Sequence, residues 1–102
     1  MSKAVKLLLT WNVRPGREED YLEFVTQDFP ESMLEANLQP TEAWYTVYGN
    51  WPEVTMGFMV EDLETLRDFL TSRTWYKLRR KLSTYIEDYH QKAIPLQRGY
   101  QI

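Results

Sequence analysis

Residues 5 to 25 of this 102-residue chain read VKLLLTWNVRPGREEDYLEFV, and this stretch decides how the fold begins. Its first nine residues alternate, and one side of the alternation is wholly apolar: Val5, Leu7, Leu9, Trp11 and Val13. A period of two with one apolar face predicts a β-strand. Pro15 and Gly16 are typical of a turn. The acidic residues 18 to 20 favour the first turn of a helix, where the helix dipole stabilises negative charge. The stretch therefore predicts a strand, a turn and a helix in succession.

The apolar stripe of this first helix runs Tyr21, Val25, Phe29 and Met33 at steps of four, so one side must pack on a sheet. Pro30 lies within the pattern, and its missing amide predicts a kink or a restart near that residue. Asn37 is a suitable left-handed residue for the end of the helix, and the proline that follows at position 40 prevents its continuation.

Residues 43 to 49 and 54 to 60 are rich in aromatic and β-branched side chains and predict a hairpin, with residues 49 to 52 as its turn. Asp62 is then expected to cap a short helix that ends near Leu70, before a break and a second cap at residues 71 to 74.

A longer helix is predicted from Trp75 to Ala93 because its apolar residues keep near-heptad spacing. Pro95 would end it. Alternation in Leu96 to Ile102 predicts a last strand.

The resulting order, β-α-β-β-α-β, predicts a single α+β domain over residues 1 to 102 with a ferredoxin-like fold. Its four-stranded antiparallel sheet would carry both helices on one face. The opposite face would include Leu8 and Met59 and stay uncovered in a monomer. A second copy laid across it would remove these side chains from water, so we expect a homodimer.

Composition narrows the function classes. The net charge of −3 argues against nucleic acid as a partner, and the basic residues at 77 and 79 to 81 are interpreted as a solvated helix face. The chain has no cysteine, which excludes disulfides and thiolate chemistry. No apolar run is long enough to span a membrane. We expect a cytoplasmic protein that binds neither membrane nor nucleic acid.

Two short motifs resemble a known superfamily. The segment from Val13 to Glu18, with Tyr21 and Phe24, is similar to the strand, turn and helix start of the dimeric α/β-barrel superfamily, whose best-known members are the antibiotic-biosynthesis-monooxygenase-like proteins. The segment from Leu70 to Trp75, with Leu78, resembles that superfamily's helix break before a buried tryptophan. The resemblance implies a fold that dimerises as an α/β barrel. The activities of that superfamily include cofactor-free oxygenation of phenols, haem degradation and isomerisation.

Haem-degrading relatives use an asparagine on the first strand together with a tryptophan and a histidine. Asn12, Trp75 and His90 are present here. On a continuous helix Trp75 and His90 would stand roughly 22 Å apart, too far to hold one porphyrin from the same side. Nucleotide, phosphate-loop and zinc motifs are also absent from the sequence. We therefore expect no cofactor and no metal, and we interpret His90 as a surface residue near a helix end.

The remaining candidate is a group of aromatic residues near the cleft between sheet and helices. Tyr45, Tyr48 and Arg98 are the candidate catalytic groups, because tyrosine hydroxyls and an arginine can hold a phenolate or enolate without a cofactor. Expected to line the pocket are Trp11, Tyr21, Trp44, Trp75 and Tyr76. A cofactor-independent monooxygenase or isomerase of a small aromatic or carbonyl compound is one hypothesis. A non-catalytic protein that binds a small ligand, or a purely structural dimer, is the other.

Overall fold

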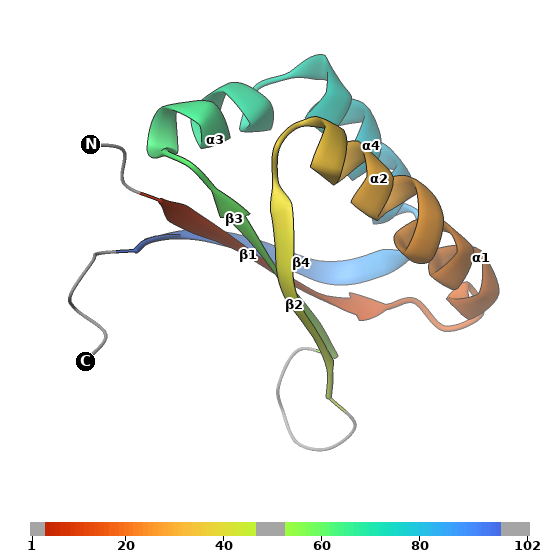
Figure 1. Ribbon diagram of the computed structural model, residues 1–102. Helices are drawn as coiled ribbons and strands as arrows, with labels where there is room; N and C mark the ends of the chain where they lie inside the picture. The colour runs from red at the N-terminus through yellow and green to blue at the C-terminus, as the bar shows by residue number, and fades with distance from the viewer. Residues whose placement is uncertain (1–3, 47–52, 97–102) are drawn as a thin grey trace.

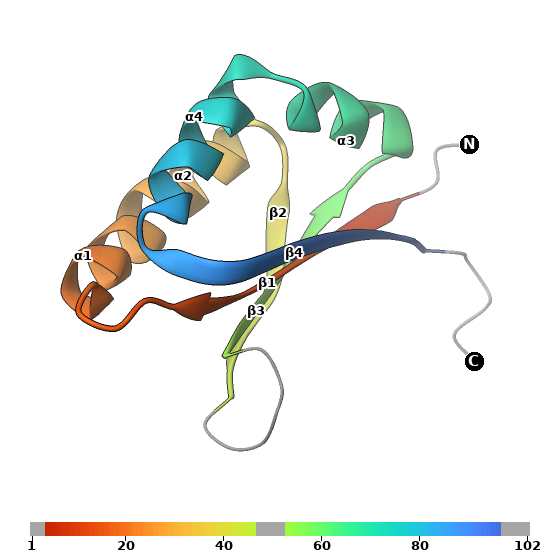
Figure 2. The same cartoon turned by 180° about the vertical axis from the view of Figure 1, so that it is seen from behind.

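The computed structural model describes residues 4–46 and 53–96. All helical segments cover one face of a twisted sheet (Figure 1), and the same two layers are seen from behind in Figure 2. Along the chain the elements are β1 (Val5–Val13), α1 (Glu18–Glu23), the π-helical η1 (Phe24–Asp28), α2 (Phe29–Glu35), β2 (Gln39–Tyr45), β3 (Val54–Val60), α3 (Leu63–Leu70), α4 (Arg73–Ser83) and β4 (Ile86–Pro95).

The sheet confirms the predicted fold class. Its strand order is β2-β3-β1-β4, and every neighbouring pair is antiparallel, as in a ferredoxin-like fold. In the register of the central pair, Leu7 lies opposite Phe58 and Trp11 opposite Val54. These side chains are buried beneath the helices, so the apolar face predicted for residues 5 to 13 is confirmed, and it lies next to the buried face of β3.

The first helical stretch begins and breaks where the sequence predicts. Gly16 has a φ of 87°, which glycine adopts without strain, and α1 starts two residues later. Before Pro30 the hydrogen bonds widen, and the Phe29 N–H donates to the carbonyl of Phe24, five residues back. A π-helical segment at this point accommodates Pro30, which has no N–H to donate to a helical hydrogen bond. Asn37 ends the helix with a φ of 68°.

The predicted caps of the next two helices are also confirmed. Asp62 accepts a hydrogen bond from the N–H of Thr65, and Ser72 accepts one from the N–H of Trp75.

The prediction of a helix from Trp75 to Ala93 is wrong beyond Ser83, where α4 ends. The hydroxyls of Ser83 and Thr84 donate to the carbonyls of Arg80 and Lys81 in the last helical turn, and the N–H of Thr84 also donates to the carbonyl of Lys81. The chain then turns into β4, which pairs with β1. The last strand thus begins at Ile86, ten residues before the predicted start at Leu96. Positions 97–102 of the predicted strand are outside the described residues.

β2 also lies earlier than predicted, at Gln39–Tyr45 rather than at residues 43 to 49. Pro40 argues against a strand because it has no N–H to donate. β2, however, is an edge strand, and its register against β3 shifts between Pro40 and Glu42. An edge position with a bulge tolerates a missing donor. Residues 47–52 of the predicted hairpin lie outside the described residues.

One apolar core fills the space between the two layers. Several side chains are almost completely buried there, among them Trp11, Leu7, Leu9, Phe29, Met33, Leu66 and Leu82. Trp11 stands at its centre, with edge-to-face contacts to Tyr21 and Phe29 and a stacked contact with Tyr89. This core fixes the backbone next to the cleft described below.

Candidate functional site

A cleft of about 480 Å³ opens between the first helical stretch and the ends of β2 and β3. This size is within the range of small-molecule sites. Its walls combine apolar side chains with tyrosines and two carboxylates: Val13, Glu18, Tyr21, Leu22, Val25, Ala43, Trp44, Tyr45, Glu53 and Val54.

Glu53 is held in place by three hydrogen bonds. One carboxylate oxygen accepts from the N–H of Val13 at 2.8 Å, and the other accepts from the Tyr45 hydroxyl at 2.8 Å. The N–H of Glu53 donates to Oδ1 of Asn12 at 2.8 Å. β1 and β2 therefore orient a carboxylate that directly precedes β3. The bond to Glu53, together with its negative charge, raises the pKa of Tyr45, because ionising the tyrosine would place two anions side by side.

Tyr21 supplies a hydrogen-bond donor beside this carboxylate. Its side chain is 5% exposed, and its oxygen accepts a hydrogen bond from Nε1 of Trp11 at 3.0 Å. Burial, aided by the charge of Glu53, raises the pKa of Tyr21, although the bond from Trp11 opposes the shift. The phenol is thus neutral near pH 7. Among the described residues nothing accepts its own hydrogen, which is free to bind an oxygen in the cleft.

The structure brings three of the sequence-predicted site residues together in this cleft, namely Tyr21, Trp44 and Tyr45. Trp11 lies behind them in the core and reaches the cleft only through Tyr21. Sequence reasoning missed Glu53. The signal for it was an acidic residue directly before an apolar strand, where no helix dipole or cap accounts for the charge.

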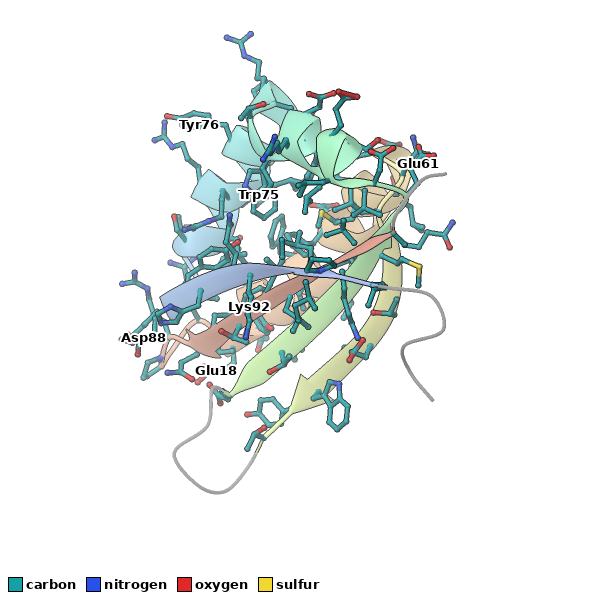
Figure 3. The ribbon with its side chains drawn as sticks, turned by 90° about the vertical axis from the view of Figure 1, so that its left-hand side faces the viewer. Glu18, Glu61, Trp75, Tyr76, Asp88 and Lys92 are labelled. Atoms are coloured by element: carbon teal, nitrogen blue, oxygen red, sulfur yellow. The ribbon has the colours of Figure 1, made fainter. Side chains whose placement is uncertain are left out.

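The other predicted residues lie elsewhere. Trp75 points inward from α4 and packs against Phe29 and Phe69, whereas Tyr76 points away from the sheet into solvent (Figure 3). Neither lines the cleft. Tyr48 and Arg98 are outside the described residues.

His90 does not end a helix as predicted. It lies on β4 opposite Thr10, on the face of the sheet that the helices leave open, while Trp75 is buried on the other face. The expected separation of roughly 22 Å between Trp75 and His90 was wrong because it assumed one continuous helix. The two side chains are nevertheless apart, because they lie on opposite faces of the sheet. Asn12 is engaged by Asp88, to which its amide donates at 3.2 Å, and by Glu53. The structure therefore does not gather Asn12, Trp75 and His90 into one site.

Within residues 4–46 and 53–96, no three histidine or acidic side chains come together as metal ligands would. In the same part of the chain, no helix is long and apolar enough to cross a membrane.

Comparison with known proteins finds the fold but no close relative. Neither a protein-family model nor a curated protein sequence matches the chain. Among solved structures, a NIPSNAP family protein from Agrobacterium tumefaciens is 16% identical with a TM-score of 0.68, covering 95% of this chain and 88% of that chain.

Two further structures share the same architecture. A protein of unknown function from Bacteroides fragilis, described as dimeric and ferredoxin-like, is 12% identical with a TM-score of 0.63, covering 91% of this chain and 96% of that chain. A hypothetical protein from Arabidopsis thaliana is 8% identical with a TM-score of 0.73, covering 91% and 88% of the two chains. Structural similarity at these low sequence identities establishes the ferredoxin-like fold. Any activity has to be inferred from the residues of the site.

Proposed function

We propose that the chain binds a small aromatic or carbonyl compound in the cleft beside Glu53, as one half of a homodimeric α/β barrel like those of the antibiotic-biosynthesis-monooxygenase-like proteins. The observation that carries the binding proposal is the pairing of Tyr21 and Glu53. A neutral phenol and an oriented carboxylate both line the cleft, and its other walls are mostly apolar apart from Glu18 and Tyr45. Few polar groups on apolar walls are typical of sites that orient a small ligand. A cytoplasmic location remains a prediction of the sequence.

The arrangement supports cofactor-independent isomerisation. Glu53 would remove a proton from a carbon next to the ligand's carbonyl group. The electron pair of that C–H bond would move onto the carbonyl oxygen as an enolate, which the Tyr21 hydroxyl stabilises. Return of the proton to another carbon would complete the isomerisation without any other reactant. The monooxygenase hypothesis begins with the same deprotonation and needs dioxygen as second substrate, so isomerisation is the simpler use of these two residues.

The homodimer is supported by the open face of the sheet. This face carries Leu8, Trp44, Met59 and Ile94 around an ion pair between Lys6 and Glu42. Trp44 and Met59 are exposed in the single chain. The similar protein from Bacteroides fragilis is described as dimeric. A stable dimer would bury about 1,200 to 2,000 Å² in total.

Sedimentation tests the homodimer. At tens of micromolar the wild type should sediment as a dimer, because dimerisation covers the apolar side chains on the open face of the sheet. Leu8→Glu should sediment as a monomer, since it places a charge at the centre of the face. Leu34→Glu, which alters an exposed leucine on the outer side of α2, is the matched control and should remain dimeric. A monomeric wild type would refute the proposal.

Binding is tested with 4-hydroxyacetophenone, which offers both a phenol and a carbonyl oxygen. It should quench tryptophan fluorescence, because Trp44 lines the cleft. Tyr21→Phe should bind about tenfold more weakly, as expected for the loss of one buried hydrogen bond. Tyr76→Phe removes a hydroxyl far from the cleft and should bind as the wild type does. Equal affinity of wild type and Tyr21→Phe would contradict the assigned site.

Proton transfer separates the enzyme from a binding protein. In heavy water, an enolising site should exchange the methyl hydrogens of the same probe for deuterium, as followed by proton NMR. Glu53→Gln should abolish this exchange and keep binding, whereas Glu18→Gln, at the same cleft, should exchange normally. Binding without exchange in the wild type would favour the non-catalytic alternative.

A further inference from the structure

A second hollow of about 330 Å³ adjoins the cleft. Val25 and Ala43 line both spaces, so the two meet at these residues. From there the second hollow continues along β2 toward its start, below the junction of η1 and α2. Its walls are Val25, Phe29, Pro30, Pro40, Thr41, Glu42, Ala43, Met56, Gly57 and Phe58.

The polar groups are distributed unevenly along the combined groove. The cleft holds two tyrosines, Tyr21 and Tyr45, and the carboxylates of Glu18 and Glu53, so it offers a ligand several polar groups. In the second hollow the Thr41 hydroxyl donates to Glu42, and the Glu42 carboxylate is paired with Lys6. The polar side chains there are already engaged by the protein. A ligand that extends from the cleft into the second hollow therefore passes from a polar end to an apolar one.

The lining also distinguishes among possible occupants. Pro30 and Pro40 have no N–H, and most of the other lining residues present hydrocarbon or aromatic surface. A peptide laid in this hollow would lose hydrogen bonds to water without replacing them, which is costly. A hydrocarbon chain has no such bonds to lose, and its burial is favourable. The wall chemistry fits an alkyl chain better than a peptide.

We infer that the ligand is elongated, with an oxygen-bearing ring in the cleft and an unbranched apolar chain in the second hollow. This inference rests on the proposed function and specifies its ligand class. Residues 40 to 45 of β2 line the groove, which therefore runs for roughly 17 Å at the usual rise of a strand. Such a length accommodates a ring followed by several methylene groups.

The test uses the alkyl esters of 4-hydroxybenzoate, from methyl to octyl, which share one ring and differ only in the length of the alkyl chain. Isothermal titration calorimetry of the wild type should show an affinity that rises about three- to fourfold for each added methylene, the gain for burying one such group. The rise should stop when the chain outgrows the hollow.

A pair of variants assigns that rise to the second hollow. Pro40→Glu puts a charge into the lining of the second hollow, at an exposed position opposite Phe58. It should flatten the dependence on chain length and change the affinity for the methyl ester less than twofold. Gln39→Glu adds the same charge one residue away, opposite Met59 on the open face, and should leave the whole series unchanged.

The outcomes separate this inference from the proposed function. If the methyl ester binds and Tyr21→Phe weakens it, but chain length has no effect, the proposed function stands and the elongated ligand is refuted. A rise with chain length that persists in Pro40→Glu also refutes it, because the chain then lies elsewhere. If no ester binds the wild type, both proposals fail.

Discussion

Two tryptophans show how differently this small domain uses its aromatic residues. Trp75 is 5% exposed and packs against Phe69, with ring centroids 5.3 Å apart, in the filled core under α4. Trp44 is 62% exposed on the edge strand, where it belongs to the open face of the sheet and also borders the cleft. One region is a completed interior, whereas the other leaves large apolar surface available. The high aromatic content of the sequence is therefore divided between folding and a candidate binding surface.

The largest expected effect is the loss of stability when Trp75 is removed. Trp75→Ala should lower the free energy of unfolding by about 3 to 5 kcal/mol, since it removes buried contacts and leaves a cavity. Trp44→Ala should lower it by less, because this side chain is exposed in the single chain and loses only the contacts that the partner subunit would make. Thermal and urea unfolding of both variants measures the difference.

Trp75→Phe is the control for this comparison and should fold with an intermediate Tm, since a smaller aromatic ring keeps part of the packing. A Trp75→Ala variant that melts within a degree or two of the wild type would show that Trp75 lines open space. The distinction between core and cleft would then be wrong.

Tyr21 joins the two regions and should show an effect of intermediate size. Tyr21→Phe removes the oxygen that accepts from Nε1 of Trp11 and leaves that buried donor unpaired. The expected cost is about 1 to 3 kcal/mol in the free energy of unfolding, measured by urea denaturation. Tyr76→Phe, at an exposed position, should cost about 0.5 kcal/mol or less. Equal stability of the two variants would mean that Trp11 has another acceptor.

The smallest effect concerns alkaline pH. Burial raises the pKa of Tyr89 to about 12, and the positive charge of Arg79, whose guanidinium lies 3.5 Å from the ring centre, only partly offsets this. Between pH 10 and pH 12 the folded chain therefore holds a proton that the unfolded chain has released, and stability falls as the pH rises.

Unfolding experiments across this interval should show a shallower fall for Tyr89→Phe than for the wild type, because the variant has no proton to lose at this position. In a direct titration of phenolate absorbance, removing Tyr89 should delete the component at the highest pH. A fall of the same steepness in both proteins would show that the Tyr89 ring is solvated like the walls of the cleft.

Much of the fold could be predicted from the sequence because local rules govern it. The alternation of residues 5 to 13, the turn at Gly16 and the caps at Asp62 and Ser72 depend on residues close in the chain. The candidate site was predicted in part. Tyr21, Trp44 and Tyr45 come together as aromatic residues near a cleft, whereas Glu53 was missed because its partners lie on other strands.

The sequence by itself determined the order of the first elements, the helix caps and the two-layer architecture, since each follows from short-range periodicity and backbone preferences. Only the tertiary structure decided that residues 86 to 95 form a strand. Opposite Trp11, β4 carries the extra residue Asp88 with a φ of 55°, so Ile86 and Tyr89 reach the same face at a spacing of three. Apolar residues three positions apart are also typical of one face of a helix, so the sequence pattern predicted a helix here. Pairing with β1 determines the strand, because eight of the ten residues of β4 have partners on β1. These partners are distant in the sequence, so the pairing cannot be recognised from the periodicity of residues 86 to 95.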